Sequence, residues 1–477
     1  MAAAGRLDAA VEAVEQILAG SPSRFDAVLL LGELLEARGD LAGATTAYER
    51  AIRARSGSAV AHDKLGFVLG RQGRIPEALA GFARAIKLDP MLFEAQYHLG
   101  ATRWWTKDLN GAMAPLRAAV RLRPDHPEAR YYLGDTLRQS GSLPEAAIQL
   151  REAVRLAPAL APAHLQLGVT LQALGDLDGA LASLKRAAAL DPVPDALNSL
   201  GLALMQSGNG AEAVDTFRKL IAAHPSFASG RLNLATTLMH QGDLGGAVEL
   251  LEAVTAEQPD NAEAFYNLGV ALKQRDDFDR AELALRRAVT LAPKLGDPPF
   301  TLGVLLWQTG RSADAEQMFR EAIARTPDSA DAHYMLATVL KADGRVDAAI
   351  TELRAAIRLR TDSIEAHQSL AQLLQQRGDA DGARLAREEA DRLARRKADA
   401  QASAFAVSVG RQKLKAGDRP AAIAQFREAI RLAPDNADAY HALGVALQQG
   451  GAAAEAREHF ERARKLAPNL YPREGRQ

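Results

Sequence analysis

The sequence predicts an all-α fold, an α-solenoid made of antiparallel helical hairpins. Three observations support this prediction: a sequence repeat near 34 residues, a composition dominated by helix formers, and few aromatic residues, which make up 5% of the chain. Strong helix formers with sparse β-branched and aromatic residues favour helices over strands. A length of 477 residues suggests about three domains of ~150 residues each, but a repeat array grows by adding units instead of separate cores.

A Leu-Gly or Leu-Ala pair marks each repeat, and only Val409 replaces the leucine. The second member of the pair is called the repeat Gly/Ala below. It occurs thirteen times, at Gly32, Gly66, Gly100, Gly134, Gly168, Gly201, Ala235, Gly269, Gly303, Ala337, Ala371, Gly410 and Gly444. An alanine follows twelve residues later, a bulky apolar residue usually comes four after that, and a proline closes most units.

Each unit is predicted to contain three elements in order: a helix A, a short turn and a helix B. The turn carries Gly or Asp, as in Gly73-Arg74 and Asp276-Asp277. The repeat Gly/Ala of helix A and the alanine of helix B are small, so the two helices can approach closely. The bulky residue one turn along fills the neighbouring space. The proline ends helix B and starts the next unit.

This pattern at this period resembles the tetratricopeptide repeat family. The resemblance covers essentially the whole chain, with about thirteen repeats after an N-terminal half repeat. It implies a right-handed superhelix whose A helices line a concave, ligand-holding groove. We expect a half repeat (helix B only) in residues 1–23, repeats 1–11 in residues 24–396, and repeats 12–13 in residues 397–477 after an extended helix.

Both ends of the chain depart from the template. The chain begins with a helix B that has no helix A before it. We expect either that a partner covers this helix or that upstream sequence, such as a signal or an anchor, is missing from this chain. Residues 469–477 contain Pro472 and cannot continue as a full capping helix, which predicts an uncovered face on the last hairpin.

Repeat 11 departs in a different way. Arg387 replaces its bulky residue, and the step from Ala371 to Gly410 is 39 residues instead of 34. Residues 380–409 contain Gly382 and no later Gly or Pro, which predicts an over-long helix rich in charge. This helix either bridges two sub-arrays in solvent or forms a basic docking patch between Arg384 and Lys397.

Composition excludes several functions. The net charge is −1 and the pI is about 6.8, so no global field attracts nucleic acid or an anionic membrane. The absence of cysteine excludes disulfides, thiolate metal sites and a cysteine nucleophile. No apolar run approaches the ~20 residues of a membrane span. We expect a soluble, cytoplasmic protein, or a periplasmic or exported one if an N-terminal signal is missing.

No catalytic motif is recognisable. The phosphate-loop, His-Glu-x-x-His and Gly-x-Ser-x-Gly patterns are absent, so we expect no enzyme, no cofactor and no metal site. Four histidines, each three residues before the repeat leucine, are assigned to repeat packing instead of metal binding. They are His62, His164, His333 and His367.

The resemblance also implies a binding face. In the family, the residues two before and five after the repeat leucine face the groove. In this sequence they include the pairs Tyr97 and Trp104, Tyr131 and Arg138, Tyr266 and Lys273, Phe300 and Trp307, and Tyr334 and Lys341. Members of a pair lie seven residues apart, on one helix face. Rings and cations there suit an extended peptide with acidic or aromatic anchors. Alternatively, some rings pack between adjacent A helices.

As binding residues, these side chains should be largely exposed in the free protein. Asn233 and Asn267 lie one residue before the leucine in consecutive repeats. They correspond to the asparagines with which relatives hydrogen-bond a peptide backbone.

The sequence thus predicts a non-enzymatic scaffold or adaptor that binds a peptide or helix of a partner protein in its groove. Two alternatives remain open. One is the substrate-recruiting arm of an enzyme, such as a protein glycosyltransferase with its catalytic part on another chain. The other is a homo-oligomer that assembles through uncapped array ends.

Overall fold

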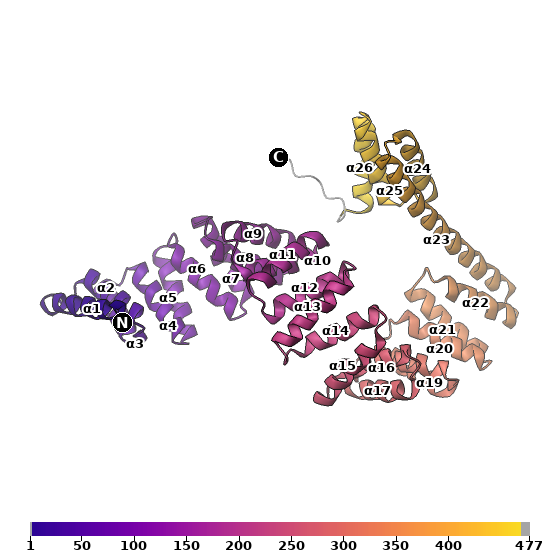
Figure 1. Ribbon diagram of the computed structural model, residues 1–477, viewed down its shortest axis with the longest axis horizontal. Coiled ribbons are helices and arrows are strands. Elements are labelled where there is room, and N and C mark those ends of the chain that lie inside the picture. The colour runs from indigo at the N-terminus through magenta and orange to yellow at the C-terminus, as the bar shows by residue number, and fades with distance from the viewer. Residues whose placement is uncertain (1, 469–477) are drawn as a thin grey trace. The chain divides into compact units, whose positions relative to one another are not determined.

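The computed structural model describes residues 2–468, with side chains described from residue 6 onward. Within this range the chain forms 26 helices and no strand, as the sequence predicts (Figure 1). By its internal contacts the chain falls into two compact units, Met1–Val254 and Thr255–Gln477, and each is described by itself.

Unit 1 starts with a single helix B, α1 (Ala2–Gly20), followed by seven hairpins, the last helix of which ends at Glu257, just past the unit boundary. The A and B helices alternate in the order α2 (Phe25–Arg38), α3 (Leu41–Ala54), α4 (Ala59–Arg71), α5 (Ile75–Leu88), α6 (Phe93–Trp105), α7 (Leu109–Leu122), α8 (Pro127–Gln139), α9 (Leu143–Leu156), α10 (Ala161–Ala173), α11 (Leu177–Leu190), α12 (Pro194–Gln206), α13 (Gly210–Ala223), α14 (Ala228–His240) and α15 (Leu244–Glu257). The expected N-terminal half repeat is confirmed as a helix, since α1 buries Val11, Val14 and Leu18 against α2.

Unit 2 continues the same alternation until one long helix interrupts it. Its helices are α16 (Ala262–Gln274), α17 (Phe278–Leu291), α18 (Asp297–Gln308), α19 (Ser312–Arg325), α20 (Ala330–Ala342), α21 (Val346–Leu359), α22 (Ile364–Arg377), α23 (Ala380–Lys415), α24 (Arg419–Leu432), α25 (Ala437–Gln449) and α26 (Ala453–Leu466).

The fifth hairpin, α10–α11, shows why the repeated residues produce a close pair of helices joined by a tight turn. A Cβ atom on Gly168 would lie 2.5 Å from Cγ of Leu184, so only glycine fits at this helix crossing. Ala180 and Leu184 are completely buried on the opposite helix. Gly175 ends helix A with a φ of +83°, a conformation that favours glycine. Asp176 then caps helix B by accepting a hydrogen bond from the Gly179 amide at 3.0 Å.

The four equivalent histidines act in repeat packing, as predicted. In each, the Nε2 atom is 3.1 to 3.3 Å from the carbonyl oxygen six residues earlier, at the start of the same repeat. The bond ties helix A to the turn that precedes it. The four pairs are His62 with Ser56, His164 with Pro158, His333 with Pro327, and His367 with Thr361.

The over-long helix is also confirmed. α23 has 36 residues and serves as helix B of repeat 11 and helix A of repeat 12. Residues 394–402 are all exposed, so this stretch is helical although none of its side chains is buried in the core. The expected domain boundary at 396/397 falls inside α23, and the division into three domains stays a prediction. Residues 469–477, expected to leave the last hairpin uncovered, lie outside the described residues, so that expectation stays a prediction.

Candidate functional site

The twelve residues predicted to face a groove are buried to a similar extent. Each is partly buried, and none is largely exposed, so the expectation of a solvent-exposed set is wrong. The A helices of neighbouring repeats lie against each other, as α4, α6 and α8 do, and aromatic rings of α6 contact aromatic rings of α8. The set comprises Tyr97, Trp104, Tyr131, Arg138, Asn233, Tyr266, Asn267, Lys273, Phe300, Trp307, Tyr334 and Lys341.

In unit 1 these rings form a continuous cluster on α6 and α8. Trp104 lies 4.8 Å from Tyr132 and 6.0 Å from Tyr131, measured between ring centroids. Tyr97 lies 6.0 Å from Tyr132 and 5.0 Å from His126. We call these five residues the A-face cluster. Edge-to-face and tilted ring pairs at such distances stabilise one another beyond the apolar area that they bury.

A buried carboxylate fixes the geometry of this cluster. Asp135 is 2% exposed and accepts hydrogen bonds from Trp104 Nε1 at 2.7 Å, Arg138 Nε at 2.9 Å and Gln139 Nε2 at 2.6 Å. The Trp104 indole is thereby held in one orientation. Because Arg138 is paired with Asp135, its positive charge is largely neutralised on this face.

A second buried carboxylate lies one repeat earlier. Asp63 is 2% exposed, and its Oδ1 atom is 2.9 Å from Nδ1 of His98. The His98 ring in turn contacts Phe67, at 4.9 Å between centroids. Aromatic rings that contact one another, with ring nitrogens bound to buried carboxylates, therefore extend over the A helices of repeats 2 to 4.

Burial raises the pKa of the tyrosine phenols in the cluster. Desolvation is the largest cause for Tyr97, Tyr131 and Tyr132, and neighbouring carboxylates add to it, Asp135 for Tyr131 and Glu128 for the other two. These phenols stay neutral through the physiological range and can donate hydrogen bonds to a ligand.

Sequence reasoning missed Trp105, which is 66% exposed. It directly follows Trp104 at the end of α6. Residues adjacent in a helix point about 100° apart, so the choice of Trp104 for the binding face excluded its neighbour. The two consecutive tryptophans, Trp104 and Trp105, could have indicated that one of them is exposed.

Three of the predicted residues of unit 2 contact a neighbouring side chain. The Tyr266 hydroxyl lies 3.3 Å from the Thr301 hydroxyl, and Lys341 Nζ donates to Gln372 at 2.5 Å. The Phe300 ring packs 5.9 Å from Phe319, a core residue of its own hairpin. Burial lowers the pKa of Lys273.

The two asparagines predicted to bind a peptide backbone lie in different units. In unit 1, Asn233 Nδ2 donates to Asn198 Oδ1 at 2.7 Å, so one amide hydrogen of Asn233 is already used within the protein. Asn267 lies in unit 2 and is partly buried. Their role toward a peptide backbone stays a prediction.

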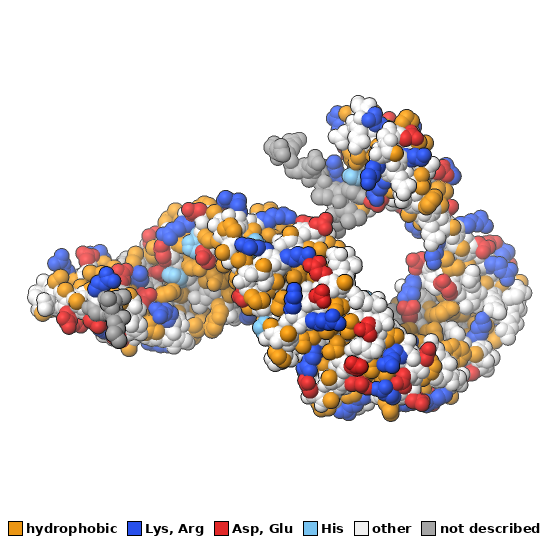
Figure 2. Space-filling model, viewed as in Figure 1, with side chains coloured by type: hydrophobic (Ala, Val, Ile, Leu, Met, Phe, Trp, Pro, Cys, Tyr) orange, Lys and Arg blue, Asp and Glu red, His pale blue; other side chains and the backbone are white. Residues whose placement is uncertain are grey.

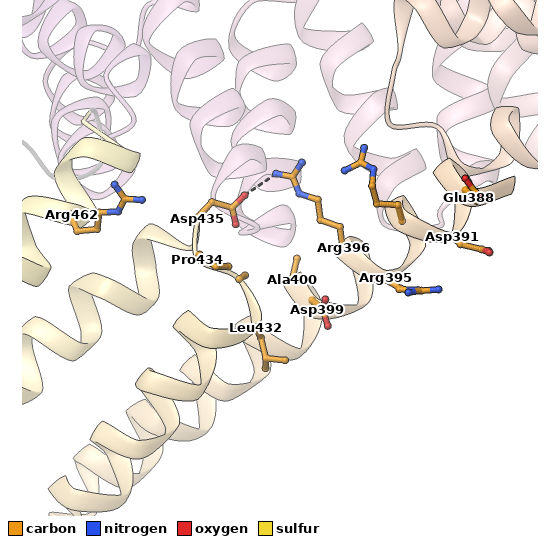
Figure 3. A pocket seen from close by; sticks show the side chains of 12 residues that line it. Glu388, Asp391, Arg395, Arg396, Asp399, Ala400, Leu432, Pro434, Asp435 and Arg462 are labelled. Atoms are coloured by element: carbon orange, nitrogen blue, oxygen red, sulfur yellow. Dashed lines mark hydrogen bonds and ion pairs between the residues drawn. The ribbon is translucent and has the colours of Figure 1, made fainter. Parts of the chain in front are cut away.

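The charged helix α23 borders a hollow of about 850 Å³ in unit 2. Figure 3 shows its walls, formed by α23, the turn between α24 and α25, and Arg462 of α26. Arg396 pairs with Asp435 across it at 2.8 Å, and Arg384 and Arg392 pair with Glu388 and Glu389 along the helix. Three of the six cations of the predicted basic patch are therefore paired with carboxylates, which favours the interpretation as a solvated bridging helix.

The surface shows the same balance on a larger scale. In both units, on the face drawn in Figure 2, blue and red side chains are interspersed.

Across residues 2–468, no helix is both long and apolar enough to cross a bilayer. In that same range, no three His, Asp or Glu side chains gather as a set of metal ligands.

Family models match most of the chain. One model, described as tetratricopeptide repeat, matches residues 2–59, 64–127, 108–161, 165–226, 232–295 and 300–364. A model described as TPR repeat matches residues 410–451, and a further tetratricopeptide repeat model matches residues 437–470. The matched ranges leave out residues 365–409, where α22 leads into α23. Among curated proteins, no sequence matches this chain.

Solved structures resemble parts of the chain. A crystal structure of MamA is 25% identical, covers 35% of this chain and 96% of its own, and has a TM-score of 0.33. The structure of YrrB, a TPR protein with an unusual peptide-binding site, is 25% identical, covers 40% of this chain and 98% of its own, and has a TM-score of 0.37. A tetratricopeptide repeat protein from Parabacteroides merdae is 18% identical, covers 52% of this chain and 98% of its own, and has a TM-score of 0.43. The family matches extend over well more than half of the residues, and the chain belongs to the tetratricopeptide repeat family.

Proposed function

We propose that this protein is a non-catalytic scaffold that binds a peptide or helix of a partner protein on the A helices of repeats 2 to 4. The observation that carries this proposal is Trp105, which is 66% exposed and lies next to Trp104 of the A-face cluster. Tryptophan is enriched among the residues that contribute most to binding energy at protein interfaces. A protein ligand also agrees with membership of the tetratricopeptide repeat family.

The chemistry of this face favours apolar and aromatic anchors in the ligand over acidic ones. The Arg138 guanidinium is occupied by buried Asp135, which leaves a carboxylate ligand little uncompensated charge to bind. Trp105 offers a large apolar ring, and the neutral phenols of the cluster offer hydrogen bonds. Because Asp135 holds Trp104 in place, little side-chain entropy is lost there on binding.

The proposal is tested with peptides selected from a randomised display library against the full chain. We expect Trp105→Ala to weaken the selected peptides roughly 10- to 100-fold, as expected for an aromatic hot spot. Because Trp105 is exposed, the circular dichroism spectrum and the melting temperature should stay unchanged.

Ile148→Ala is the matched control, since Ile148 is 60% exposed on helix B of repeat 4, in the same unit. It should leave the affinity unchanged. Equal losses for both variants, or no loss for Trp105→Ala, would place the binding site elsewhere.

A further inference from the structure

Neighbouring repeats pack through two recurring positions. On helix A, the residue five before the repeat Gly/Ala is Ala, Gly or Pro in twelve of thirteen repeats, and it is buried in all twelve. On helix B, the residue twenty after the repeat Gly/Ala is usually Ile or Val. At the junction of repeats 3 and 4, these residues are Ala129 and Val120, which pack in one cluster with Ala119.

The junction of repeats 11 and 12 has different residue types at both of these positions. Phe405 replaces the small residue and is 71% exposed, and Asp391 replaces the Ile or Val and is also exposed. Gln412 is exposed at a position where the other repeats have Leu, Val, Thr or Ala. Phenylalanine would overpack an ordinary junction. The sequence is therefore adapted to keep repeats 11 and 12 apart along α23.

The side of helix B that carries Asp391 and the side of helix A that carries Phe405 lie on one face of α23. At 3.6 residues per turn, positions spaced alternately four and three apart form a single stripe. Eight exposed residues follow this spacing, and we call them the α23 stripe: Arg387, Asp391, Ala394, Ala398, Gln401, Phe405, Ser408 and Gln412. The stripe is about 37 Å long at 1.5 Å per residue. This alternating spacing is that of helices packed side by side in coiled coils.

We propose that the α23 stripe pairs in antiparallel orientation with the α23 stripe of a second copy of this chain. The two-fold axis passes midway between Ala398 and Gln401. In this register Phe405 of one copy lies over Ala394 of the other, and Ala398 faces Gln401. The outer layers join Asp391 to Ser408 and Arg387 to Gln412. The large ring meets a small residue, and no two like charges share a layer.

The repeat architecture identifies the occupant as a second copy. Along the array, a helix B normally packs against the helix A that follows it. In α23, helix B of repeat 11 and helix A of repeat 12 are joined end to end, so within one chain they cannot pack on each other. Two antiparallel copies of α23 place helix B of repeat 11 in one copy beside helix A of repeat 12 in the other, twice over, with the self-complementary symmetry of two-fold dimers. The pairing uses no residue of the face proposed to bind a partner protein.

Sedimentation velocity of the full chain over a wide concentration range tests the pairing. We expect a monomer–dimer equilibrium whose dissociation constant rises roughly 100-fold in Phe405→Ala, since each dimer loses two buried rings. Leu283→Ala is the control, because Leu283 is equally exposed on α17, and it should leave the equilibrium unchanged. A chain that stays monomeric throughout, or a dimer indifferent to Phe405→Ala, would overturn the proposal.

Cross-linking tests the register, because the chain has no cysteine of its own. A mixture of the Ala398→Cys and Gln401→Cys variants should form inter-chain disulfides under mild oxidation faster than either variant alone. Ala400→Cys points away from the stripe and should form none. Fastest self-linking of Ala398→Cys would indicate parallel pairing, and equal linking of Ala400→Cys would indicate random collision. Either result would contradict the antiparallel dimer.

Discussion

Gly168 and Ala180 show how the size of single residues sets the distance between the helices of a hairpin. A Cβ atom on Gly168 would lie within 2.5 Å of Leu184, and Ala180 is 0% exposed. The same arrangement recurs in unit 2, where a Cβ atom on Gly410 would lie 2.4 Å from the Phe426 ring. These small residues are required because the neighbouring core is already filled.

We expect Ala180→Leu to lower the free energy of unfolding of its stretch of the array by about 1–3 kcal/mol through overpacking. Ala182→Leu is the control, because Ala182 is exposed on the same helix, and it should have little effect. Urea unfolding monitored by circular dichroism compares the two. An Ala180→Leu variant as stable as Ala182→Leu would show that the hairpin crossing tolerates a larger side chain.

Buried phenols give a second prediction at the residue scale. The pKa values of Tyr48, Tyr97, Tyr131 and Tyr132 are raised, chiefly by desolvation, so these four should ionise only above the ordinary value of about 10. The folded protein then holds protons that the unfolded chain releases. The free energy of unfolding is therefore unaffected below about pH 10 and falls as the pH rises beyond it.

Ultraviolet titration of tyrosinate checks this prediction, with the unfolded chain in denaturant as the reference. Folded protein should show delayed ionisation relative to the reference, and Tyr97→Phe should remove part of the delay. A folded titration curve that coincides with the unfolded one would contradict the buried phenols.

Among the elements, α23 is held together differently from the other helices. Residues 394–402 are exposed all round, so their helicity rests on the intrinsic propensity of Ala, Arg, Lys and Gln. On either side, the helix is anchored by packing, through Ala390 and Leu393 in repeat 11 and through Ala406 and Val407 in repeat 12.

We expect Ala400→Pro to break α23 in its exposed stretch and leave both flanking hairpins folded. Proline in a helix interior costs about 3 kcal/mol and disturbs the preceding turn. Limited trypsin digestion should then cut after Arg395, Arg396 or Lys397 much faster than in the parent chain. Ala400→Gln, which keeps the helix, should resist like the parent. Equal resistance of the proline variant would show that packing, not propensity, holds this stretch.

The elements also show what sequence can and cannot predict. The hairpins and α23 follow from local signals, such as the repeat Gly/Ala and the lack of Gly or Pro after Gly382. The exposure of predicted site residues does not, because it depends on side chains far along the chain. Trp104 is covered by Tyr132 and hydrogen-bonded to Asp135, about one repeat away in sequence. Phe405 could have been found by aligning the thirteen repeats, since its position is otherwise small.

At the scale of the whole molecule, stability and function are distributed along the array. Within each unit, a hairpin packs mainly on the hairpins next to it, so a mutation changes mainly the stability of its own part of the array. The aromatic face of repeats 2 to 4 lies in unit 1 and the α23 stripe in unit 2. Mutation should therefore alter the proposed partner binding and the proposed self-association separately.

Site-specific photo-cross-linking tests whether the A helices of repeats 2 to 4 bind a partner protein. A benzophenone amino acid at position 105 replaces one exposed aromatic side chain with another, and the same group at position 148 provides a control of similar exposure. In extracts of the native host, irradiation should join the position-105 protein to one discrete protein partner that competes with peptides selected by display. Adducts of equal yield and identity at both positions, or none at position 105, would contradict the account.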